Sequence, residues 1–147
     1  YHFNFGYPLL SADSRVVTSK ATVSPLNDMS HDPGNMMEPV DGRGEELYFY
    51  TGLGDRACGV IYNEALELGA YIAWDTKNLP NFLEWKNMKS HDYVLGIEPC
   101  NTCGLNRDDA TKAGKIAVLP AYSSVENHIE LGVLDGLTEI REFVRNL

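Results

Sequence analysis

The chain is poor in cysteine and in basic residues. Of its 147 residues three are cysteine, and 12 Lys and Arg stand against 21 Asp and Glu, giving a formal net charge of -9. The lack of a basic cluster argues against nucleic acid or an anionic membrane as the binding partner. Cys100 and Cys103 are spaced like a metal or redox pair, but no second pair exists to complete a zinc site. We therefore expect reduced thiols, no metal or cofactor, and a cytoplasmic protein.

Long hydrophobic runs are also missing. No apolar stretch reaches the length of a membrane span, and no signal peptide is visible. The hydrophobic content of 44% and charged content of 22% are typical of a globular protein, so residues 1–147 are expected to form a single domain. Because the chain begins at Tyr1, without a methionine and inside a strand-like pattern, we also expect that its N-terminus has been cut away.

Alternation with a period of two residues dominates the chain and indicates β-strands. Strands are predicted at residues 15–24, 46–51, 58–62, 68–74, 93–98, 115–119 and 125–133. A helix is predicted only at the C-terminus, where one helical stripe holds Leu137, Ile140, Phe143, Val144 and Leu147 and where Asp135 or Thr138 could cap the first turn. With one further helical turn at residues 107–113, the predicted fold class is all-β with a terminal helix.

Residues 26–44 show no periodicity and are rich in proline, glycine and polar residues. A loop of this length inside a compact domain is usually either functional or disordered. The sequence does not choose between the two.

Glu98 closes the apolar run of residues 93–98 and is followed by Pro99, which cannot donate to a sheet and should end the strand. Alternation places Glu98 on the same face as Val94 and Gly96. An acid on an otherwise apolar strand, beside a glycine that leaves room, must be paired, solvated or catalytic. The alternative is an ordinary surface glutamate at a strand end.

The first eight residues carry a second pattern of interest. His2, Asn4 and Gly6 fall on one face, and the aromatic residues Tyr1, Phe3 and Phe5 fall on the other. Two polar groups thus stand on a surface that aromatic side chains support from behind. The pattern indicates either a functional surface or an edge strand with solvated polar residues.

Residues 1–10 (YHFNFGYPLL), 79–86 (LPNFLEWK) and 92–99 (DYVLGIEP), in this order and spacing, resemble the aldose 1-epimerase-related proteins. These proteins form a less characterised branch of the galactose mutarotase-like superfamily. The resemblance implies a β-supersandwich of mostly antiparallel strands, of which this chain is the C-terminal portion. It also implies that His2 corresponds to an active-site histidine and Glu98 to the catalytic glutamate.

The two residue types suit anomer interconversion on chemical grounds. The ring must open, rotate about C1–C2 and close on the other carbonyl face, which requires a base at the O1 hydroxyl and an acid at the ring oxygen. A carboxylate at Glu98 and an imidazolium at His2, on opposite sides of the ring, could supply both without a cofactor. We therefore expect the two side chains to face each other across a gap as wide as a monosaccharide.

Further residues are predicted to bind substrate: Asn4, Trp85, Lys86, Glu46 and Asn101. Trp85 could stack on the apolar face of a sugar or pack in the core, and Lys86 could donate to hydroxyls or be a solvated surface lysine. A second histidine and an aspartate block that galactose mutarotases use have no counterpart here, so the sugar or sugar derivative stays open. The rival functions are a non-catalytic carbohydrate-binding module and another isomerase or lyase. A homo-oligomer, or a missing N-terminal half, is expected to cover the exposed side of the partial sandwich.

Overall fold

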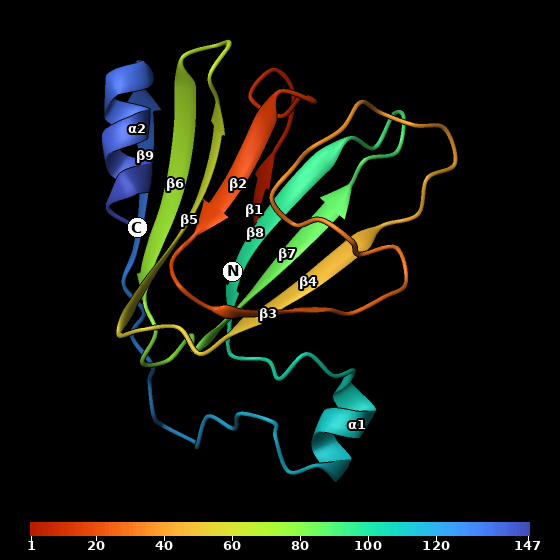
Figure 1. Cartoon of the computed structure of the whole chain (residues 1–147). Helices are drawn as coiled ribbons and strands as arrows, with labels where there is room; N and C mark the ends of the chain where they lie inside the picture. Colours follow the sequence, from red (N-terminus) through yellow and green to blue (C-terminus); the bar gives the residue numbers. More distant parts are fainter.

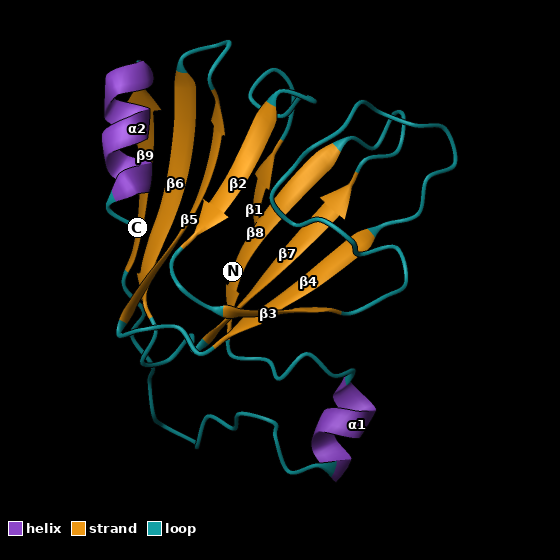
Figure 2. Ribbon diagram, in the orientation of Figure 1, coloured by secondary structure: helices purple, strands orange, loops and turns teal.

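In the computed structural model, which describes residues 1–147, two antiparallel sheets pack face to face (Figures 1 and 2). One sheet has five strands in the order β1 (Phe3–Phe5), β8 (Val94–Cys100), β7 (Asn81–Asn87), β4 (Glu46–Thr51) and β3 (Thr22–Pro25). The other has four strands in the order β2 (Ser14–Thr18), β5 (Arg56–Asn63), β6 (Leu68–Asp75) and β9 (Ile129–Asp135). The predicted all-β sandwich is confirmed.

The core lies between the two sheets and follows from the period-two pattern. Ile61 and Ile72 point inward from the four-stranded sheet, and Phe82 and Ile97 point inward from the five-stranded sheet; all four are completely buried. Since successive residues of a strand point to opposite faces, the neighbours of Ile97 in β8, Gly96 and Glu98, lie on the outer face of the five-stranded sheet.

Helix α2 (Leu137–Arg145) covers the outer face of the four-stranded sheet, as Figure 1 shows. Its Ile140 is buried in a second apolar cluster against Val60 and Leu134. The predicted cap at Asp135 or Thr138 is wrong, because Gly136 occupies the N-cap position without any side-chain hydrogen bond. Gly136 has a φ of 92°, a conformation in which glycine is favoured.

Most of the predicted strands are confirmed within one or two residues. The predicted strand at 15–24 is instead divided, since β2 and β3 belong to different sheets. Residues 115–119 form no strand, and β9 starts only at Ile129. The short helix α1 (Arg107–Lys112) is present, and Figure 1 shows that it projects beyond one end of the sandwich. Neither helix is long and apolar enough to cross a membrane.

Strand β7 was not predicted, because its inward-facing residues break the apolar pattern. Phe82, Glu84 and Lys86 share the inner face, and Glu84 is as completely buried as Phe82 while Lys86 is nearly so. Strand β8 also extends beyond its predicted end, to Cys100. Pro99 is tolerated there because β1 pairs only with residues 95–97, so that β8 has a single strand neighbour at the proline.

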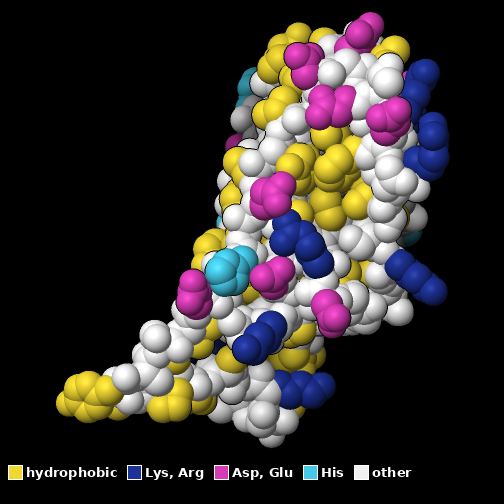
Figure 3. Space-filling model, turned by 90° about the vertical axis from the view of Figure 1, so that its left-hand side faces the viewer, with side chains coloured by type: hydrophobic (Ala, Val, Ile, Leu, Met, Phe, Trp, Pro, Cys, Tyr) yellow, Lys and Arg dark blue, Asp and Glu magenta, His cyan; other side chains and the backbone are white.

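The edge strand β9 leaves apolar side chains uncovered. Leu131 and Val133 pair with Ile72 and Ala70 of β6, yet they are 60% and 65% exposed because no strand of the other sheet lies opposite them. The side of the molecule that carries β9 and α2 faces the viewer in Figure 3, where hydrophobic side chains gather in a patch bordered by acidic and basic ones.

Candidate functional site

The site begins with the pairing of β1 and β8. In this antiparallel pair Asn4 lies opposite Gly96 and Phe3 lies opposite Ile97, which brings His2 alongside Glu98 on the outer face of the sheet. His2 Nε2 lies 3.0 Å from Glu98 Oε1. The glutamate side chain is 14% exposed and the histidine side chain is 48% exposed. Residues 96 positions apart in the sequence thus form a partly shielded acid–base pair that solvent can still reach.

The predicted gap between the two side chains is wrong, because they touch. Neighbouring strands lie only about 4.8 Å apart, so side chains at adjacent positions of β1 and β8 are within direct reach of each other. The carboxylate and the imidazole are within ion-pair distance of each other, and they form a salt bridge when His2 is protonated.

Trp85 completes the cluster from the neighbouring strand β7. It lies opposite Gly96 in the ladder, and its ring meets the His2 imidazole nearly edge-on, with centroids 5.6 Å apart and planes at 80°. Trp85 is partly exposed, and Asn4 is exposed on the same outer face. The structure therefore brings together four of the predicted site residues: His2, Asn4, Trp85 and Glu98.

Burial raises the pKa of the Glu98 carboxyl above its ordinary value, because removing water disfavours the charged form. The nearby His2 and the amino group of Tyr1 oppose this shift by favouring the carboxylate. Burial is the larger influence. A carboxyl group of this kind takes up a proton more readily than an exposed glutamate does, so it can serve as base and as acid in successive steps.

Glu46 and Lys86 do not join the site, which corrects the prediction that they contact substrate there. They face each other across β4 and β7 on the inner face of the sheet, and only 3% and 2% of their surfaces are exposed. The physical reason is the pleat of the strand, since Trp85 and Lys86 are consecutive and must point to opposite faces.

The buried Lys86 instead binds the backbone of the loop of residues 26–44. Lys86 Nζ donates to the backbone carbonyls of Asp32, at 2.5 Å, and Asn35, at 3.0 Å, and lies 3.4 Å from Glu46 Oε2. Arg43 donates to the other Glu46 oxygen at 2.7 Å. This long loop, which was predicted to be either functional or disordered, is therefore ordered by buried charge-assisted hydrogen bonds.

Sequence reasoning missed one unusual group, Glu84. Its side chain is completely buried between the sheets, where Tyr50 donates a hydrogen bond to Oε2 and Oε1 has no partner. Burial raises the pKa of Glu84 to about 8. The only signal in the sequence was a charged residue between apolar neighbours, which equally fits an exposed strand position.

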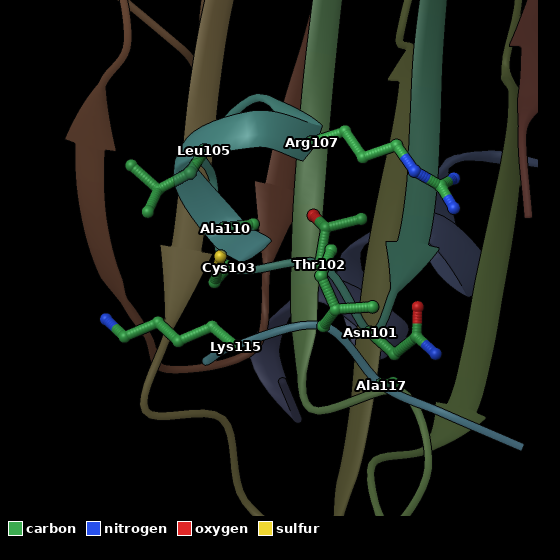
Figure 4. Close-up of a pocket in the computed structure, with 9 residues that line it drawn as sticks. Asn101, Thr102, Cys103, Leu105, Arg107, Ala110, Lys115 and Ala117 are labelled. Carbon is green, nitrogen blue, oxygen red and sulfur yellow. The ribbon is translucent and has the colours of Figure 1, made fainter. Parts of the chain in front are cut away.

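Asn101 lies apart from the acid–base pair, in a hollow of about 270 Å³ beside α1. Figure 4 shows this hollow, in which Arg107 and Lys115 extend in opposite directions rather than toward a common point. Neither His2 nor Glu98 lines it. The prediction that Asn101 binds the same substrate as His2 and Glu98 therefore finds no support in this geometry.

The side chains offer no group of three or more His, Cys, Asp or Glu residues that could hold a metal ion. Cys58, Cys100 and Cys103 are free thiols, and Cys58 is buried, which raises its pKa to about 11.

Comparison with known proteins supports the fold. A solved structure of a candidate aldose 1-epimerase from Klebsiella pneumoniae subsp. pneumoniae MGH 78578 superposes with a TM-score of 0.88 and 23% sequence identity. The match covers 99% of this chain and 40% of that chain, so the sequence spans less than half of the neighbour's length. The predicted galactose mutarotase-like β-sandwich is thus confirmed as a fold.

Comparison by sequence gives a family without an assigned activity. No curated protein matches the chain. A family profile described as a domain of unknown function, DUF4432, matches residues 1–133, which is most of the chain. The chain therefore belongs to the DUF4432 family.

Proposed function

We propose that this domain interconverts the α and β anomers of a sugar by acid–base opening of the ring, with Glu98 as the base and His2 as the acid. The observation that carries the proposal is the 3.0 Å contact between His2 Nε2 and Glu98 Oε1 on the open face of the five-stranded sheet. The fold shared with a candidate aldose 1-epimerase adds support.

A touching pair fits the reaction because both oxygens that exchange protons are bonded to the same carbon, C1. In the opening step the Glu98 carboxylate accepts the O1 proton while protonated His2 donates to the ring oxygen. The bond between C1 and the ring oxygen then breaks, and C1 and O1 become a carbonyl. His2 is the more exposed partner, so we expect it to move aside when the sugar enters.

Ring closure reverses both roles. After rotation about C1–C2, neutral His2 takes the proton from the ring hydroxyl as its oxygen attacks the other face of the carbonyl. Glu98, now protonated, donates to the carbonyl oxygen. The raised pKa of Glu98 assists this donation, while the neighbouring His2 keeps enough of the carboxylate available for the opening step.

Trp85 and Asn4 are proposed to position the sugar. The Trp85 ring lies beside His2, where it can contact the apolar C–H surface of a sugar, and the exposed Asn4 amide can bond a hydroxyl group. Lys86, Glu46 and Asn101 have no part in this proposal because of where they lie.

A non-catalytic carbohydrate-binding module is the second candidate. The observation in its favour is that the five main hollows of the surface are lined by residues other than His2, Glu98 and Trp85. An open face excludes little water, which suits binding better than catalysis.

The test is anomer exchange measured by NMR on a panel that includes α-D-glucose, α-D-galactose and their uronic acids. Glu98→Gln should lower the exchange rate by roughly 100- to 10,000-fold, the usual contribution of general acid–base catalysis. The exposed Glu126, which lies 3.7 Å from His128, provides a matched control, and Glu126→Gln should leave the rate unchanged. Equal rates for wild type and Glu98→Gln on every sugar would refute the proposal. Affinity without exchange would favour the binding module, and a new product would indicate isomerisation or elimination.

A further inference from the structure

We infer that Gly96 is a positioning residue of the site, and that the missing side chain at this point of β8 is what lets Glu98 reach His2. The predicted loss of activity rests on the proposed function, whereas the predicted loss of the contact between Glu98 and His2 does not.

The space above Gly96 is where the three side chains of the cluster meet. An ideal Cβ built on Gly96 would lie 2.8 Å from Glu98 Oε1, 3.2 Å from His2 Cε1 and 3.3 Å from Trp85 Cε3. The first distance is shorter than real Cβ contacts, and the other two are tighter than most of them. Hydrogen at this position is therefore the only substituent that leaves all three side chains in place.

The glycine is needed for space and not for backbone conformation. The glycines with positive φ in this chain are Gly42, Gly52, Gly104, Gly114 and Gly136. Gly96 is not among them, because it lies in a regular strand whose backbone any residue can adopt.

The backbone at Gly96 cannot retreat from an added methyl group. Strand β8 is paired on both sides at this point, with Asn4 of β1 and with Trp85 of β7. The end of the Glu98 side chain is the most flexible of the three neighbours, so the carboxylate is the group that must move. Moving it breaks the 3.0 Å contact with His2.

Gly6 supplies the matched control. It follows Asn4 by two residues, and an ideal Cβ built there would meet nothing closer than the backbone oxygen of Tyr93, at 4.0 Å. Gly6→Ala therefore adds the same methyl group close to the site without crowding any of its side chains.

The first experiment follows the His2 imidazole by NMR and needs no substrate. In the Gly96 protein, Glu98→Gln should shift the His2 Hε1 resonance because it changes the partner of the ring. In a Gly96→Ala background the same Glu98→Gln change should leave that resonance in place, whereas in a Gly6→Ala background it should shift it as in wild type. An undiminished shift in the Gly96→Ala background would overturn the inference, whatever the activity of the protein.

The second experiment uses anomer exchange. Gly96→Ala should lower the rate roughly 100-fold, the cost typical of a catalytic group misplaced by about 1 Å, and Gly6→Ala should change it less than twofold. In the Glu98→Gln background, Gly96→Ala should lower the rate by less than a further twofold, because the carboxylate base that the methyl group would displace has already been removed. A full additional 100-fold loss in the double variant would contradict a role through Glu98. If Glu98→Gln itself exchanges sugars at the wild-type rate, the proposed function fails, and the NMR experiment alone decides the role of Gly96.

Thermal unfolding covers the case in which Gly96→Ala folds poorly. Combining Gly96→Ala with Glu98→Ala removes the carboxylate that the methyl group would meet, so the double variant should recover most of the lost thermal midpoint or regain folding. An equal loss with and without the carboxylate would show that the methyl group acts elsewhere and would overturn the inference.

Discussion

The completely buried Glu84 makes the stability of this protein depend on pH in a way that one substitution can test. Burial, the largest influence, raises the pKa of its carboxyl from the ordinary 4.5 to about 8. That value already includes the charges of Glu46 and Asp32, which raise the pKa, and the hydrogen bond from Tyr50 and the charge of Lys86, which lower it. At neutral pH the native protein therefore keeps Glu84 largely protonated, while the unfolded chain does not.

The sign and size of the effect follow from proton linkage. Since the native state holds the proton more tightly, the contribution of Glu84 to stability is fully present below pH 4.5 and is lost as pH rises toward 8. The interval between 4.5 and about 8, at about 1.36 kcal/mol per pH unit, amounts to roughly 5 kcal/mol. Glu84→Gln cannot ionise and should not show this loss.

The assay is urea unfolding of wild type and Glu84→Gln at several pH values between 4.5 and 9. The free energy of unfolding of wild type should fall relative to that of the variant by a few kcal/mol across this range, with the steepest change between pH 5 and 8. Other titrating groups act on both proteins and cancel in the difference. The exposed Glu126 again gives the control, as Glu126→Gln should run parallel to wild type. Parallel curves for wild type and Glu84→Gln would refute a protonated, buried Glu84.

Three further predictions concern the site, the buried lysine and the edge strand. The rate of anomer exchange should fall on acidification, because protonation of Glu98 removes the base. Since burial raises the pKa of Glu98, the fall should begin at a higher pH than the pKa of an exposed glutamate would give. A rate–pH profile that falls only at the pKa of an exposed glutamate would contradict this. Lys86→Met leaves the buried Glu46 without its lysine partner, so it should lower the free energy of unfolding by roughly 3 kcal/mol and speed proteolysis within residues 26–44. Lys89 pairs with Asp92 on the surface, and Lys89→Met should not change the cleavage pattern. The domain should self-associate through the exposed apolar side chains of the edge strand β9, and Leu131→Lys should reduce this association in sedimentation velocity. A wild-type protein that stays monomeric at every concentration would contradict this prediction.

The local pattern of the sequence determined most of the strands, the terminal helix and the faces of the site residues. Alternation placed Glu98 with Gly96, and His2 with Asn4, and the structure keeps both pairs on the outer face. This success has a simple cause, since the pleat of a strand fixes the direction of each side chain from its position alone. Where the core accepts charge, as at Glu84 in β7, the apolar pattern is broken and the strand was not predicted.

Only the tertiary structure decided which of these faces meet. The pairing of β1 with β8 joins residues almost a hundred positions apart, and its register brings His2 into contact with Glu98 instead of leaving a gap. The pleat puts Trp85 and Lys86 on opposite faces, but only the packing of the two sheets decides that Lys86 is on the buried face and Trp85 is beside the His2–Glu98 pair. Strand order and register depend on long-range packing of the two sheets, and no local period encodes them.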